Sequence, residues 1–221
     1  MKFEPIPQPI ELFKAPSIYY LSADLGQVND FTAITIIQRI VKTDCGGKEQ
    51  AREYHLRHIE RLPLGTTYPS VIARIKLLAD RLTDERRAVV IDLTGVGRPV
   101  WDLMQTSGFR GQVNGITITG GNTVSREGGI YSVPKRDLVT SLQVAFQNGQ
   151  LKIARGLPEG DALVKELTNF KVKISNAGHD TYEAWRESIH DDIVLSASMG
   201  LWLASQKRCR MYGRDPGFIT V

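Results

Sequence analysis

Short runs rich in Ile, Val and Thr alternate along this chain with longer stretches that carry apolar residues at helical spacing. Three of the short runs come first and are separated by turn residues, which predicts strands over residues 18–25, 31–41 and 51–62. Consecutive strands joined by short turns pair antiparallel. The first part of the chain therefore predicts an antiparallel meander.

The pattern changes after residue 67. Apolar residues then recur every three or four positions over 68–82, which predicts an amphipathic helix. The elements expected after it are a strand at 88–93, a helix near 100–107, a strand at 112–118, a polar Gly-rich loop or hairpin at 120–130, helices at 134–148 and 159–170 around a brief apolar segment at 151–154, paired strands at 170–174 and 180–185, and a closing helix at 190–207.

Three antiparallel strands, then a helix, then strands alternating with helices, is the element order of a ribonuclease H-like α/β fold. We therefore expect one mixed sheet, with three antiparallel strands followed by parallel strands, flanked by helices. Residues 17–207 are predicted to form this domain. The Pro-rich residues 1–16 are expected to be a linker or arm, and residues 208–221 a basic C-terminal tail.

Composition sets further bounds on the kind of protein. A chain of 221 residues is long enough for one domain with a full core and short for two. No apolar stretch reaches the roughly 18 residues of a membrane span, and the N-terminus lacks a signal-peptide pattern. Two cysteines give no disulfide framework and fit a reducing compartment. The net charge of +4 is compatible with a polyanionic partner.

Aspartates stand where buried segments meet polar ones. Asp24 ends the first predicted strand, Asp92 ends the fourth, and Asp191 and Asp192 open the last helix. Mg²⁺ and Mn²⁺ prefer several anionic oxygens, so the sequence predicts a divalent-metal site that only the fold could assemble. Each residue also has a local alternative, because Asp24 could close an Asx-turn and the others could cap helices.

Two metal ions about 3.5–4 Å apart can hydrolyse a phosphodiester, and the aspartates suit that arrangement. Asp24 is expected to bridge both ions from the central strand, with Asp92 and one of Asp191 or Asp192 completing the ligand set. Neighbouring helix positions differ by about 100° in direction, so the two helix aspartates cannot face the site equally. His190 could shuttle a proton or touch a metal, or it could cap the helix.

Several cations are candidates for contact with DNA phosphates. Arg98 lies near Asp92 in the sequence, Arg126 falls in the Gly-rich segment, and Lys135 and Arg136 open a predicted helix. Each could instead be a solvated surface charge. The chain has no Gly-x-x-x-x-Gly-Lys-Ser/Thr motif, so no P-loop motor is expected within it.

Four segments resemble motifs of the nuclease domain of the tailed-bacteriophage large terminase subunit. They are Ser22-Ala23-Asp24-Leu25-Gly26 with Asp30-Phe31-Thr32-Ala33, Val90-Ile91-Asp92-Leu93-Thr94-Gly95-Val96-Gly97, Val133-Pro134-Lys135-Arg136-Asp137-Leu138-Val139, and His190-Asp191-Asp192-Ile193-Val194. The resemblance spans about residues 18–205, and the His-Asp-Asp segment is its most specific element. It implies a metal-dependent DNA endonuclease that cuts concatemeric viral DNA during genome packaging, with Mg²⁺ or Mn²⁺ held by Asp24, Asp92, Asp191 and Asp192.

The same resemblance implies partners and a location. Double-stranded DNA would be the substrate, and the terminase ATPase domain, absent from this chain, would precede the arm. The portal and the small terminase subunit would be further partners, no membrane would be involved, and the host cell cytoplasm would be the place of action. The segment at 120–130 is expected to be a hairpin that gates access of DNA to the cleft.

Other functions remain open at the level of sequence. A Holliday-junction resolvase-like nuclease would share the fold and prefer four-way junctions. A non-catalytic docking module would keep the acidic residues as a vestige and gain no stability from metal. A nucleotide-binding phosphotransferase of the actin and sugar-kinase type would begin a phosphate loop at Asp24, but that fold duplicates its core and needs a longer chain.

Overall fold

The computed structural model describes residues 13–14, 17–26, 30–44, 49–82, 87–95, 97–176 and 191–206. The predicted strand at 180–185, His190 and the basic tail lie outside these residues, as does most of the predicted arm. Within the arm, β1 (Phe13–Lys14) is a two-residue strand that pairs with the end of β3. Among the helices described here, none combines the length and the apolarity that a membrane crossing requires.

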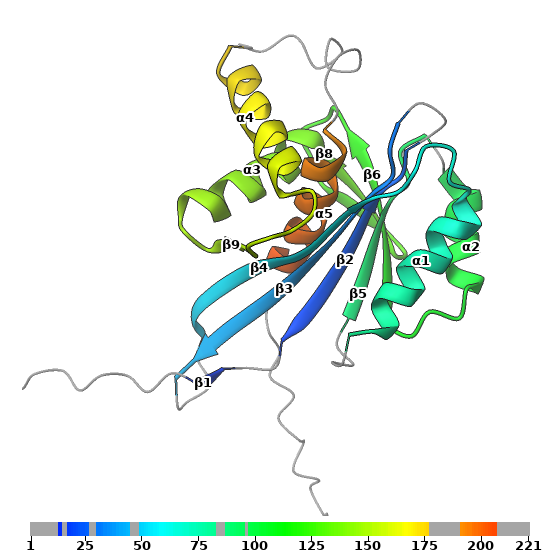
Figure 1. The fold of residues 1–221 in the computed structure, drawn as a ribbon, viewed down its shortest axis with the longest axis horizontal. Coiled ribbons are helices and arrows are strands. Elements are labelled where there is room, and N and C mark those ends of the chain that lie inside the picture. The colour runs from blue at the N-terminus through cyan, green and yellow to red at the C-terminus, as the bar shows by residue number, and fades with distance from the viewer. Residues whose placement is uncertain are drawn as a thin grey trace, which may run out of the picture.

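One mixed sheet forms the centre of the molecule (Figure 1). Its antiparallel half is β2 (Ile18–Asp24), β3 (Ala33–Thr43) and β4 (Glu49–Arg61). Its parallel half continues from β2 through β5 (Arg87–Asp92), β6 (Gln112–Thr119) and β8 (Ile130–Pro134). Strand β9 (Leu151–Ile153) adds in parallel to β4 at the other edge. The predicted ribonuclease H-like sheet is therefore confirmed.

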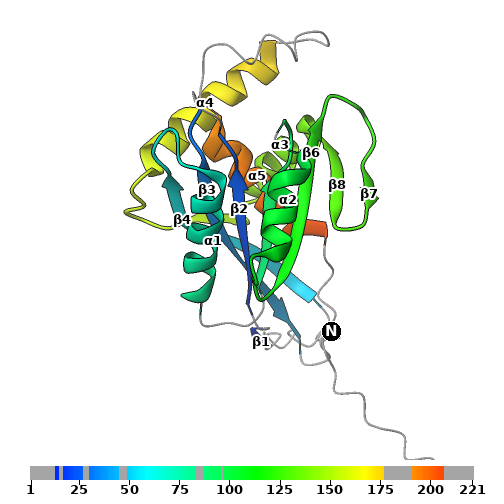
Figure 2. The ribbon, with the colours of Figure 1, turned by 90° about the vertical axis from the view of Figure 1, so that its right-hand side faces the viewer.

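Helices cover both faces of this sheet, and Figure 2 views it from the side of α1 (Tyr68–Asp80) and α2 (Gly97–Thr106). The opposite face carries α3 (Lys135–Gln147), α4 (Gly160–Asn176) and α5 (Asp192–Gln206). Successive strand residues point to opposite faces, so Leu21 and Val89 pack beneath α1 and α2, whereas Tyr20 and Val90 pack beneath the other three helices.

Helix α5 lies unusually deep, with every residue from Asp192 to Ala204 buried. Hydroxyl groups join it to the sheet: Thr35 Oγ1 is 2.9 Å from Ser22 Oγ and 3.0 Å from Ser196 Oγ. Ser196 Oγ also donates to the carbonyl oxygen of Ser22 at 2.9 Å. A Cβ atom on Gly200 would lie 2.6 Å from Ser22 Oγ, so only glycine permits this close approach. These contacts fix the start of α5 relative to the end of β2.

The structure differs from the predicted elements at residues 170–174 and defines the Gly-rich segment. The segment 170–174 is not a strand, because α4 continues to Asn176; its alternating apolar and charged residues imitate a strand, yet no Gly or Pro after Gly160 interrupts the helix. The Gly-rich segment forms a hairpin, in which β7 (Ser125–Glu127) pairs antiparallel with β8. Pro134 ends β8 and caps α3, so it precedes the first turn instead of opening it.

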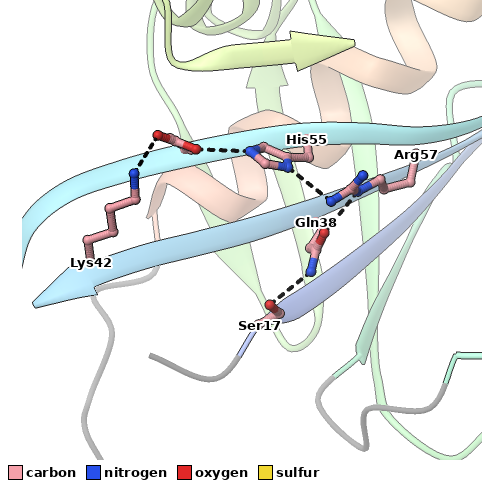
Figure 3. A network of polar contacts seen from close by, with 6 residues as sticks. Ser17, Gln38, Lys42, His55 and Arg57 are labelled. Carbon is pink, nitrogen blue, oxygen red and sulfur yellow. Dashed lines mark hydrogen bonds and ion pairs between the residues drawn. The ribbon is translucent and has the colours of Figure 1, made fainter. Parts of the chain in front are cut away.

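A chain of polar contacts runs along the outer part of β3 and β4 (Figure 3). It links, in order, Lys42, Glu53, His55, Arg57, Gln38 and Ser17, with donor–acceptor distances of 2.9–3.1 Å. Its members on β4 alternate with Tyr54 and Leu56, which face α5, so the network lies on the opposite face. His55 therefore belongs to the sheet surface and not to the aspartates at the far ends of the strands.

The close approach at Gly200 generates a stability prediction. Replacing Gly200 with Ala should lower the free energy of unfolding, because a Cβ 2.6 Å from Ser22 Oγ places the overpacking cost in the upper part of its usual range of about 1–3 kcal/mol, above the gain of about 1 kcal/mol in helix propensity. Urea unfolding measures the difference. Gly120→Ala is the control, since a Cβ there meets nothing within 4 Å. Equal stability of the two variants would show that α5 does not depend on this contact.

Candidate active site

Asp24 and Asp92 are the last residues of two neighbouring parallel strands, β2 and β5. The register pairs Ala23 with Ile91, so the two aspartates that follow stand side by side at the carboxyl edge of the sheet. Both are buried, with 9% and 7% of their surface exposed, and each carboxyl group shifts the pKa of the other. Strand pairing alone therefore brings together two residues that are far apart in the sequence.

Asp191 and Asp192 lie where α5 begins. Asp192 is the first helical residue and is 9% exposed, whereas Asp191 precedes the helix and its carbonyl oxygen accepts the Leu195 N–H at 2.9 Å. Asp191 Oδ2 accepts a hydrogen bond from Lys135 Nζ at 2.8 Å. The N-terminal end of a helix favours negative charge, which partly offsets the confinement of two adjacent carboxylates.

The electrostatics of Asp24 show that the four aspartates act on one another. Burial raises the pKa of Asp24 well above its usual value, and repulsion from Asp92, Asp192 and Asp191 raises it further. The close pairing with Asp92 raises this pKa as well. A carboxyl group surrounded by three others is where a cation would relieve the most repulsion.

Asp92 also takes part in a local turn, whereas the local alternative predicted for it was a helix cap. Its Oδ1 accepts the Thr94 N–H at 2.7 Å, which closes an Asx-turn, and Thr94 Oγ1 accepts the Ile118 N–H at 2.8 Å from β6. Burial raises the pKa of Asp92, while Thr94 and the nearby Lys135 oppose that rise. The turn and the carboxylate cluster thus coexist, and the turn fixes the direction of the side chain.

Glu166 of α4 also reaches the start of α5, although the sequence reading did not single it out. It is 5% exposed, its Oε2 accepts the N–H groups of Ile193 at 3.1 Å and Val194 at 3.0 Å, and its Oε1 pairs with Arg61 Nη2. Burial raises the pKa of Glu166 to about 7 against the lowering effect of Val194 and Arg61. One signal was available: a carboxylate stands three residues after the core residue Leu163, on the apolar stripe of its helix.

The predicted DNA-contacting cations differ in whether they contact the aspartate cluster. Lys135 alone among those with a described side chain contacts an aspartate of the cluster. Arg126 is exposed and stacks over the Tyr131 ring at 4.9 Å from its centroid. Arg136 is exposed and lies 3.3 Å from Asp137. Arg98 falls in the first turn of α2, and its side chain, like the whole of His190, lies outside what the structure describes.

The donor set suits a hard divalent cation, since it consists of carboxylate oxygens alone. Over the described ranges, no group of three or more His, Cys, Asp or Glu side chains is already arranged to hold a metal ion. In this structure Thr94 binds one oxygen of Asp92, and Lys135 binds one oxygen of Asp191. Like charges also keep unneutralised carboxylates apart. Small side-chain movements would therefore have to accompany the binding of an ion.

No model of a known protein family matches the chain, and no curated protein matches its sequence. Solved structures do match. The large terminase nuclease from thermophilic phage G20c, crystallised with bound zinc, is 21% identical with a TM-score of 0.51, over 87% of this chain and 82% of the other. The human cytomegalovirus terminase nuclease domain, soaked with Mn and bound to an inhibitor, is 13% identical with a TM-score of 0.42, over 85% and 82%. The phage comparison shows a shared fold: the mixed α/β sheet and its flanking helices have the ribonuclease H-like arrangement of a terminase nuclease domain.

Proposed function

We propose that this chain is a divalent-metal-dependent endonuclease that cuts concatemeric double-stranded viral DNA during genome packaging. One observation carries the proposal: four aspartates converge at the carboxyl edge of the sheet, and their repulsion raises the pKa of the buried Asp24. Such a cluster destabilises the metal-free protein and is therefore expected to serve a ligand. The terminase nuclease-like fold supports DNA as the substrate.

Asp24 is proposed as the bridging ligand because the charges of Asp92, Asp192 and Asp191 all act on its buried carboxyl group. Two Mg²⁺ or Mn²⁺ ions held here would activate a water, neutralise the scissile phosphate and stabilise the leaving 3′-oxygen. Asp92 would complete one coordination sphere and Asp192 the other. Their burial at the ends of regular elements limits their movement, as the geometry of these ions requires.

The two helix aspartates are proposed to have different roles. Asp192 is the more deeply placed, and it raises the pKa of Asp24 more than Asp191 does. Asp191 is paired with Lys135. We therefore assign Asp192 as the principal ligand and Asp191 as the residue that holds Lys135 beside the site, where its ammonium group could meet a DNA phosphate.

Contacts with DNA, partners and a place of action are proposed as well. Lys135, Arg126, Arg136 and Arg98 are proposed to contact phosphates, which carry no base information, so we expect cleavage without sequence specificity. His190 remains a proposed accessory residue. The partners proposed are the terminase ATPase domain, the portal and the small terminase subunit, with the host cytoplasm as the place of action and the β7–β8 hairpin as the gate for DNA.

Removing the carboxylate of Asp24 should lower nuclease activity while raising the stability of the metal-free protein. Asp24→Asn should reduce Mn²⁺-dependent plasmid cleavage at least about 100-fold, because the metal supplies several kcal/mol and each 1.36 kcal/mol is tenfold in rate. The same variant should be more stable than the wild type in EDTA at pH 7. The pKa of Asp24 is higher in the folded protein than in the unfolded chain. Its protonated form therefore stabilises the fold at a pH below the unfolded pKa, and this stabilisation is lost as the pH rises through the folded pKa. Ionised Asp24 thus opposes folding at neutral pH.

The matched control is Asp161→Asn, which makes the same change at an exposed aspartate of α4. It should leave both cleavage and EDTA stability close to those of the wild type. Undiminished cleavage by Asp24→Asn would overturn the assignment. A strong preference of the wild type for four-way junctions would favour a resolvase, and the absence of any metal effect on its melting temperature would favour a docking module.

The different roles of the helix aspartates can be tested by metal-induced stabilisation. Mn²⁺ should raise the melting temperature of the wild type by mass action. Asp192→Asn should remove most of this rise, whereas Asp191→Asn should keep most of it and mainly weaken binding of DNA. Differential scanning fluorimetry across Mn²⁺ concentrations, with DNA affinity measured in Ca²⁺, gives both quantities. The reverse order of the two variants would exchange the assignments.

A further inference from the structure

We infer that Glu166 and Arg61 form a positioning pair that sets the orientation of Asp192 and thereby the metal affinity of the site. This inference rests on the proposed function. It gives a role to the buried Glu166 and the half-buried Arg61, which are not themselves proposed as ligands.

Both oxygens of Glu166 are engaged. Oε2 accepts two backbone N–H groups, from Ile193 at 3.1 Å and from Val194 at 3.0 Å, and Oε1 accepts from Arg61 Nη2. Arg61 is the last residue of β4, and its guanidinium lies over the Phe31 ring at 5.7 Å from the centroid. The pair therefore ties the end of β4, through α4, to the first turn of α5.

The engaged oxygens argue against a direct metal role for Glu166. A carboxylate that accepts two N–H groups on one oxygen and a guanidinium on the other has little capacity left for a cation. Its negative charge instead complements the positive end of α5, as a capping residue would. The cap comes from another helix, so it fixes the place of α5 as well as satisfying its N–H groups.

The capped N–H groups belong to the two residues directly after Asp192. Holding them fixes the backbone from which the Asp192 side chain departs, and a shift of that backbone would move the carboxylate away from Asp24. Groups that orient a ligand in this way change metal affinity by about 10–100-fold when removed. Without Glu166, the first turn of α5 would be left with buried, unpaired N–H groups and would loosen.

The experiment measures the Mn²⁺ concentration that gives half-maximal plasmid cleavage, at saturating DNA and at a temperature where every variant is folded. Glu166→Leu, which removes the acceptor, should raise this concentration about 10-fold or more. Glu166→Gln keeps one acceptor oxygen and should be intermediate. Arg61→Met should also raise the Mn²⁺ requirement. The KM for DNA should change little in all three variants.

Glu60→Gln is the matched control. Glu60 precedes Arg61 on β4 and pairs with Arg74 at 2.9 Å, so its replacement also breaks a Glu–Arg pair but leaves α5 untouched. It should lose thermal stability without changing the Mn²⁺ requirement. A purely structural Glu166 would behave in the same way, and that result would overturn the inference.

Arg61→Met distinguishes positioning from ligation. If Glu166 were itself a ligand, losing Arg61 would release its carboxylate and lower the Mn²⁺ requirement, which would also overturn the inference. Mn²⁺ affinity from isothermal titration calorimetry separates this test from that of the proposed function. A wild type that binds Mn²⁺ without cutting DNA would refute the nuclease assignment, while the order of affinities among the variants would still test the pair.

Discussion

Repulsion among buried carboxylates is the constraint on which the rest of this structure depends. Asp24 and Asp92 lie side by side at the end of the sheet, and the start of α5 brings two more aspartates towards them. A group of this kind opposes folding at neutral pH, since burial and like charges disfavour the ionised form of each carboxyl group. The features around the cluster offset that repulsion in the metal-free protein, and bound cations would neutralise it.

Three of these features are nearby groups whose charge or dipole is opposite to the charge of the carboxylates. Lys135 pairs with Asp191, the Thr94 N–H group binds Asp92, and the N-terminal end of α5 favours the aspartates beside it. A fourth is the close packing of α5 on β2, which depends on the hydroxyl contacts of Ser196 and on the close approach at Gly200. Because α5 cannot move away, the carboxylates stay together despite their charge.

The sequence could predict the sheet and the places of Asp24 and Asp92 at its strand ends, because both depend on patterns that are local. Short apolar runs ending in Asp24 and Asp92 identify strands and their carboxyl ends, and the order of elements indicates which ends meet. The segment 170–174 was predicted wrongly as a strand, since alternation over five residues does not distinguish a strand from a continuing helix without a breaker. Glu166 and Arg61 could not be paired in advance, because their contact depends on how α4 crosses the end of β4. Lys135 was predicted as a cation for DNA, but its contact with Asp191 became visible only in three dimensions.

A crystal soaked in Mn²⁺ and measured at the manganese absorption edge tests the central claim most directly. The account predicts anomalous-difference peaks bounded by Asp24, Asp92 and Asp192, with Asp24 shared between two ions and Glu166 still bound to the first turn of α5. Peaks that lack contact with Asp24, or no peak at this edge of the sheet, would contradict it.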